Sequence, residues 1–224
     1  MPGINSHEHS SKRVVSDLDH PIFAASIRKI RNLYSGRQLP PIEQDVLERL
    51  IHSSGDLSIG EYLSFSPGAC AAGINALSQQ AVILTDTNMA SSAVASIASK
   101  TFLNPVKSIL QWSPVTAPPG ETRTSLGMVE ALKLFPRSVV LIGSSPTALE
   151  VLLNQVSIGV APPALVIGMP VGFIGVEDSK RHLKASGLPH IRLDGTRGGA
   201  GLVAAAANAL LRWAWLNQSC SEKS

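Results

Sequence analysis

The chain has 224 residues, 44% of them hydrophobic, and a formal net charge of +3 from 19 Lys and Arg against 16 Asp and Glu. This length suits one domain with a sizeable core. The basic residues form no long block, which argues against a nucleic-acid footprint, and the mild positive excess favours an acidic small molecule as partner.

Cysteine usage and hydropathy favour a cytoplasmic protein. Cys70 lies in an Ala-rich apolar stretch and Cys220 near the polar end of the chain, so a disulfide framework is not expected and a reducing compartment fits better. The most apolar segment, Gly201 to Leu216, is interrupted by Asn208 and Arg212 and is shorter than the roughly 20 residues that span a bilayer. We therefore expect it to be a buried helix.

The chain divides into one predicted domain and two tails. Residues 1–19 are polar and lack the apolar core of a secretory signal, which predicts a disordered lead-in. Residues 20–217 are expected to form a single α/β domain, and residues 218–224 a polar tail. The histidines near the amino end could bind a metal only adventitiously, so no metal site is predicted: His7, His9 and His20.

Two helices are predicted at the start of the domain. Pro21 suits a first helical turn, and apolar residues recur at helical spacing until Gly36. A second helix follows Pro41 and ends at Ser53-Ser54-Gly55, directly after His52. The pattern therefore places His52 at a helix carboxyl end.

Apolar runs and helical stretches then alternate. The apolar runs predict five strands: Val82 to Thr85, Val106 to Leu110, Val139 to Ile142, Ala164 to Ile167 and Ile191 to Leu193. The intervening helices include Ser125 to Leu134, Pro146 to Val156, Glu177 to Ala185 and Gly199 to Leu216. Continuous apolar runs separated by helices predict a mainly parallel, doubly wound sheet, for which we expect a flavodoxin-like strand order.

Ligands of such sheets gather at the carboxyl ends of the strands, where this chain has two glycine-containing turns. In the turn of residues 143–147, Ser145 is a plausible N-cap and Pro146 a first helical residue, so free amides there could hold a carboxylate or phosphate. A capped turn that binds nothing is the alternative. The turn of residues 197–201 favours close backbone packing or a second anion site over a dinucleotide site.

Three cationic side chains could take part in chemistry or binding. A helix carboxyl end favours the protonated form of His52, as a general acid requires, although a lone histidine there can also be purely structural. The fork of Arg123 matches a carboxylate, with surface ion pairing as the alternative. Lys180 is expected in solvent unless its helix faces the cleft. The sequence contains no nucleophile elbow, zinc spacing or nucleotide P-loop.

An ordered series of motifs resembles the precorrin-8X methylmutase family over about residues 20 to 212. The series runs Ile51-His52-Ser53-Ser54-Gly55-Asp56, Asp86-Thr87-Asn88-Met89, Thr122-Arg123, Pro146-Thr147-Ala148-Leu149, Gly168-Met169-Pro170-Val171-Gly172-Phe173-Ile174-Gly175, Ser179-Lys180 and Gly198-Gly199 through Asn208-Ala209-Leu210. Each motif alone is weak, but their order and spacing make the resemblance specific.

The resemblance implies an isomerase that moves a methyl group from C-11 to C-12 of a ring-contracted tetrapyrrole, without a redox or methyl-donor cofactor. The family is dimeric, with the tetrapyrrole near the subunit interface, and His52 matches the family histidine that acts on the macrocycle near ring C. The residues implied for substrate binding are Ser26, Asp86, Asn88, Thr122, Arg123, Ser144, Thr147, Lys180, Gly198 and Gly199. Whether the substrate contains cobalt stays open.

Two other function classes remain as alternatives. A non-catalytic tetrapyrrole carrier would need the carboxylate anchors but no acid at position 52. A nucleotide-binding regulatory domain is suggested only by the α/β pattern and the glycine turns, and fold analogy is a poor guide to function.

Overall fold

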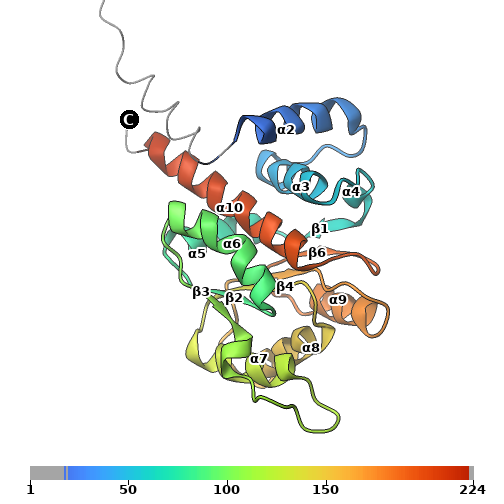
Figure 1. Ribbon diagram of the computed structural model, residues 1–224, viewed down its shortest axis with the longest axis vertical. Coiled ribbons are helices and arrows are strands. Elements are labelled where there is room, and N and C mark those ends of the chain that lie inside the picture. Colours follow the sequence, from blue (N-terminus) through green and yellow to red (C-terminus); the bar gives the residue numbers. More distant parts are fainter. Residues whose placement is uncertain (1–17, 19, 222–224) are drawn as a thin grey trace, which may run out of the picture.

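The computed structural model, which describes residue 18 and residues 20–221, is built around one sheet (Figure 1). The sheet has the strand order β1-β6-β5-β4-β2-β3. Its strands are β1 (Leu63–Phe65), β2 (Ile83–Thr85), β3 (Val106–Ser108), β4 (Val139–Ile142), β5 (Leu165–Gly168) and β6 (His190–Leu193). The helices are α2 (Pro21–Leu33), α3 (Pro41–Ser54), α4 (Ile59–Tyr62), α5 (Ala69–Ser78), α6 (Asn88–Lys100), α7 (Arg123–Leu134), α8 (Pro146–Ser157), α9 (Val176–Ala185) and α10 (Ala200–Ser221).

The predicted fold class is confirmed, with one strand added. Strands β2 to β6 are parallel and follow the flavodoxin-like order, whereas β1 pairs antiparallel with β6. Strand β1 was not predicted because it has three residues, one of them Ser64, and shows no apolar run. Strand β3 ends earlier than predicted because Ser108 caps a short 3-10 helix over Ile109–Trp112.

Helices cover both faces of the sheet, and neighbouring residues of a strand pack against helices on opposite faces. In β4, Val139 and Leu141 pack in the core that contains α3, α5, α6 and α10. Val140 and Ile142 of the same strand pack in the core that contains α7, α8 and α9. Successive strand residues point to opposite faces, so a continuous apolar run is what a strand covered on both sides requires.

The ends of α3 and α10 matter for the candidate site. Helix α3 ends as predicted, because Gly55 takes the left-handed conformation (φ 70°) and its N–H donates to the Ile51 carbonyl. Helix α10 runs to Ser221, five residues beyond the predicted end at Leu216. The apolar periodicity stops near Leu216, but no Gly or Pro follows to break the helix.

No helix within the described residues is long and apolar enough to cross a membrane. Cys70, in α5, is a free and buried thiol, and burial raises its pKa to about 12. The predicted tail of residues 1–19 lies outside the described residues except for residue 18.

Candidate active site

His52 lies near the carboxyl end of α3, where side chains of α2 hold its ring. The Nδ1 atom of His52 is 2.8 Å from Oγ of Ser26, and the ring of Phe23 meets the imidazole edge to face, with centroids 5.0 Å apart. The guanidinium of Arg49 lies over the ring of Phe23, 4.4 Å from the ring centroid. His52 itself is exposed, so its ring is fixed on one side and open on the other.

The turn after His52 is tied to the loop that follows β6. Asp56 Oδ2 lies 3.7 Å from Nε of Arg197, and the Arg197 guanidinium stacks over the ring of Tyr62 at 4.0 Å. The hydroxyl and backbone N–H of Ser58 both donate to Asp56, which lowers the pKa of that carboxyl. These contacts connect the His52-bearing turn to the carboxyl-end loops of the sheet.

Four hydroxyl groups form a second cluster where α7 and α8 begin. Oγ1 of Thr122 lies 2.8 Å from Oγ1 of Thr147 and 3.0 Å from Oγ1 of Thr124. Ser145 Oγ lies 2.7 Å from Thr124 Oγ1 and 2.9 Å from Thr147 Oγ1. Thr122 caps α7 and Ser145 caps α8, as the sequence predicted for Ser145. We call Thr122, Thr124, Ser145 and Thr147 the hydroxyl cluster.

Arg123 is the cation beside this cluster. It is exposed, and its Nε donates to the Pro114 carbonyl at 2.9 Å, which leaves the outer nitrogens of the fork free to meet a ligand. A groove begins at Thr122 and Thr147 and continues along apolar side chains of α7 and α8, such as Leu126 and Val151. The groove is also lined by the carboxylates of Glu121, Glu150 and Asp178, and Arg123 lies outside its lining. Its hydroxyl groups and the neighbouring guanidinium are the donors that suit a ligand with carboxylate arms.

The structure places Asp86, which was predicted as a direct ligand contact, in the protein interior. Asp86 is fully buried, and its Oδ2 accepts hydrogen bonds from the backbone N–H groups of Gly143, Ser144 and Ser145 at 3.0, 2.6 and 2.9 Å. Burial raises the pKa of Asp86, and the three N–H donors act in the opposite direction. The amides that the sequence suggested for a foreign anion therefore already hold a carboxylate of the protein.

Lys180, which was predicted as a carboxylate anchor, also lies in the protein interior. Lys180 is 1% exposed, and its Nζ donates to the carbonyls of Gly195 and Arg197 at 2.7 and 2.6 Å. Burial lowers the pKa of Lys180 to about 8. Its ammonium group fixes the loop after β6 and does not reach solvent.

Gly198 and Gly199 serve close backbone packing, one of the two alternatives for this turn. A Cβ on Gly198 would lie 1.9 Å from the Met169 carbonyl oxygen, and the Gly199 N–H donates to that same oxygen at 2.9 Å. Gly199 also has a φ of 134°, which residues with a side chain rarely adopt. The two glycines lock the loops after β5 and β6 together.

The remaining predicted ligand residues are open to solvent. Asn88 is the exposed first residue of α6, behind the N-cap Thr87, and Ser144 is exposed between Gly143 and Ser145. Thr124, which joins α7 to α8 in the hydroxyl cluster, was not predicted as a site residue. A hydroxyl residue two places after an N-cap was its only signal.

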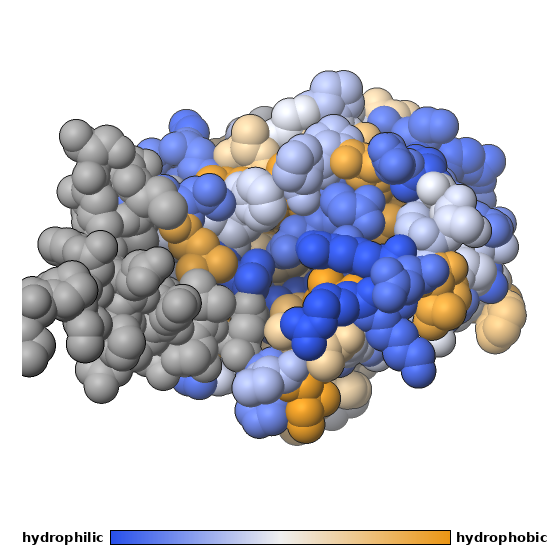
Figure 2. Space-filling model, turned by 90° about the horizontal axis from the view of Figure 1, so that it is seen from above, coloured by the Kyte–Doolittle hydropathy of each residue, from blue (hydrophilic) through white to orange (hydrophobic). Residues whose placement is uncertain are grey.

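One chain does not bring His52 and the hydroxyl cluster together. Helices α2 and α3 lie at one end of the molecule and α7 and α8 at the other, with the sheet, α6 and α10 between them (Figure 1). The face at the α2 end is mainly hydrophilic, with separate apolar patches (Figure 2). Helix α2 carries exposed Arg28 and Lys29 and no acidic residue, so this face attracts anions, whereas its Arg31 is paired with Glu48 of α3.

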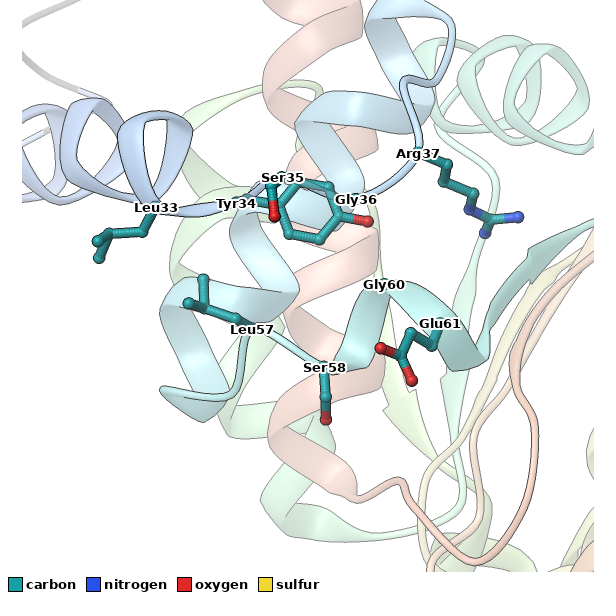
Figure 3. Close-up of a pocket in the computed structure, with 9 residues that line it drawn as sticks. All are labelled: Leu33, Tyr34, Ser35, Gly36, Arg37, Leu57, Ser58, Gly60 and Glu61. Atoms are coloured by element: carbon teal, nitrogen blue, oxygen red, sulfur yellow. The ribbon is translucent and has the colours of Figure 1, made fainter.

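A separate hollow lies at the connection between α2 and α3 (Figure 3). The ring of Tyr34 stands between Gly36 and Gly60, where an added Cβ would lie 2.3 and 2.2 Å from its Oη. Arg37 and Glu61 lie at one side of the hollow (Figure 3). Its lining includes none of the predicted site residues. Among the described residues, no group of three or more His, Cys, Asp or Glu side chains could hold a metal ion.

Comparisons with known proteins agree on one family. A family model described as precorrin-8X methylmutase matches residues 21–213. A cobalt-precorrin-8 methylmutase from Synechocystis sp. is 36% identical over 212 residues, which cover 88% of this chain and 97% of the relative. A precorrin-8X methylmutase from Pseudomonas aeruginosa is 38% identical over 191 residues, which cover 83% and 90%. The crystal structure of a precorrin-8X methylmutase from Thermus thermophilus superposes with a TM-score of 0.78 at 33% identity, over 86% of this chain and 96% of that one.

Proposed function

Because the chain belongs to the precorrin-8X methylmutase family, we propose that it moves the methyl group on C-11 of precorrin-8X, or of cobalt-precorrin-8, to C-12. Family membership makes the chain a methyl-shifting isomerase of cobalamin biosynthesis. The product is hydrogenobyrinic acid or its cobalt-containing counterpart, cobyrinic acid. The reaction is intramolecular, so it consumes no methyl donor and no redox equivalent.

The observation that carries the mechanism is the hydrogen bond between His52 and Ser26. In the imidazolium form, Nδ1–H donates to Ser26 Oγ at 2.8 Å, and the second proton is on Nε2, the nitrogen that Ser26 leaves free. Nε2–H therefore acts as the acid toward the macrocycle near ring C.

Acid assistance of this kind acts on the transition state. Protonation or hydrogen bonding by Nε2–H withdraws electron density where the migrating methyl group arrives, and the charge that develops there is largest while the bond shifts. When the corrin chromophore has formed, the proton returns to His52. The imidazole thus finishes the cycle unchanged.

The carboxylate arms of the substrate need donors away from the acid. Arg123, Thr122 and Thr147 supply a guanidinium and hydroxyl groups where α7 and α8 begin, and Ser144 and Asn88 are exposed donors in other carboxyl-end loops. Acetate and propionate groups accept charge-assisted hydrogen bonds from such donors.

The active unit that we propose is a homodimer with the substrate near the subunit interface. His52 and the hydroxyl cluster lie toward opposite ends of a single chain, so a second subunit can place its Arg123 group opposite the His52 of the first (Figure 1). The buried free thiol of Cys70 fits a reducing compartment, and we place the enzyme in the cytoplasm.

The test is a spectroscopic assay with purified protein and precorrin-8X, with and without cobalt. We expect the visible spectrum to convert to that of the corrin product, and His52→Ala to bind substrate with conversion lost. Near-normal turnover in His52→Ala would remove the acid role, and binding without conversion by the unmodified protein would make it a tetrapyrrole carrier.

A further inference from the structure

The turn between β4 and α8 contains an anion that belongs to the protein. Asp86 follows β2, and its Oδ2 accepts from three successive N–H groups of residues 143–145. Successive amides that converge in this way form the kind of concave site that usually binds phosphate or carboxylate ligands. Here the ligand is built in, and the side chain is 0% exposed.

The buried carboxylate of Asp86 is not well explained by a gain in folding stability. A buried carboxylate loses its hydration, and the other oxygen of Asp86, Oδ1, is buried without a hydrogen-bond partner. No cation faces Asp86 among the contacts described, so the three amides are its main compensation. A buried charge of this kind is better explained by the geometry that it imposes than by net stabilisation.

The geometry that Asp86 imposes continues into the hydroxyl cluster. Ser145, whose N–H binds Asp86, caps α8 with its hydroxyl and contacts Thr124 at 2.7 Å. Two residues further, Thr147 contacts Thr122 at 2.8 Å, and Thr122 is the residue before Arg123. A movement of the turn would therefore move the donors that we assign to the carboxylate arms.

We propose that Asp86 is a positioning residue, an internal anion that fixes the β4–α8 turn and thereby sets the spacing between the hydroxyl cluster and Arg123. It also occupies the amides at the start of α8, so that a substrate carboxylate binds to the hydroxyls and the guanidinium and not to the helix end. This inference rests on the proposed function, because it concerns the same substrate-binding groups.

Kinetics of Asp86→Asn separate positioning from a purely structural role. Asparagine keeps the size of the side chain but removes the charge, so the amides of residues 143–145 lose their ionic acceptor. We expect KM to rise by roughly tenfold, comparable with the loss of one hydrogen bond to a charged group, and kcat to stay within about twofold. Glu130→Gln, an exposed glutamate of α7 that pairs with Lys133 and does not line the α7–α8 groove, is the control and should leave KM unchanged.

Chemical rescue tests the same inference by a second route. Asp86→Ala removes a carboxylate and leaves a space beside the three N–H groups, which formate can fill. We expect formate to lower the KM of Asp86→Ala toward the wild-type value and to have no effect on Asp86→Asn, whose amide still fills the space. If Asp86→Ala does not fold, the Asp86→Asn comparison decides alone.

Backbone NMR tests the role of Asp86 independently of whether the protein has the proposed activity. The amide resonances of residues 143–145 should shift together in Asp86→Asn, and formate should restore them in Asp86→Ala, whether or not the protein turns over precorrin-8X. An unchanged KM together with a lowered melting temperature in Asp86→Asn would show that Asp86 is only structural. Absence of turnover in the wild type would overturn the proposed function and leave the NMR result as the test of the turn.

Discussion

The buried ammonium group of Lys180 should make the stability of this protein rise at alkaline pH. Its Nζ binds two carbonyls, of Gly195 and Arg197, and burial lowers its pKa from the ordinary 10.5 to about 8. Below pH 8 both the folded and the unfolded chain carry the proton, and the folded state bears the cost of the buried charge. Between pH 8 and 10.5 the folded state releases the proton first, so stability rises with pH.

The size of the effect follows from the two pKa values. The interval between 10.5 and about 8 corresponds to ~3 kcal/mol over the whole range, and ~2 kcal/mol of this falls between about pH 7 and about pH 9.5. The side chain is 1% exposed, so solvent screening reduces this value little. Lys180→Met removes the ionisable group and keeps an unbranched side chain in the same space.

Urea unfolding of both proteins at the two pH values measures the effect. The free energy of unfolding of the wild type should gain ~2 kcal/mol relative to Lys180→Met from about pH 7 to about pH 9.5. Other groups that titrate in this range cancel in the difference between the two proteins. A difference that stays constant, or that falls with pH, would show that the two carbonyls keep Lys180 protonated in the folded state.

Two further substitutions test the binding groups and the loop packing. Arg123→Ala should weaken binding of the tetrapyrrole by about 1.5 to 3 kcal/mol, because a hydrogen bond to a charged group is lost. Fluorescence or absorbance titration measures this change. An unchanged dissociation constant would place Arg123 outside the site. Gly198→Ala should lower the melting temperature, because the new Cβ would lie 1.9 Å from the Met169 carbonyl oxygen, and a backbone atom cannot move aside as a flexible side chain can. Gly201→Ala, where an added Cβ meets nothing within 4 Å, is its control, and equal melting temperatures for the two variants would contradict the close packing.

Local sequence signals predicted the helix ends on which the candidate site depends. Gly55 ends α3 three residues after His52, and Ser145 with Pro146 begins α8, because caps and turns depend on residues that are neighbours in the chain. The continuous apolar runs likewise predicted the parallel sheet and its order. They missed β1, whose three residues form a strand only because β6 offers an edge to pair with.

The sequence by itself determined the family, the α/β sheet and the position of His52 at a helix end, because each of these depends on nearby residues or on the order of motifs. Only the tertiary structure decided which charged residues are buried. An aspartate after a strand looks the same whether it reaches solvent or turns inward, and the amides that hold Asp86 lie 57 to 59 residues further along the chain. Lys180 is similar, since its carbonyl partners lie in a different loop. Burial of a charge depends on such distant partners, and no local pattern specifies them.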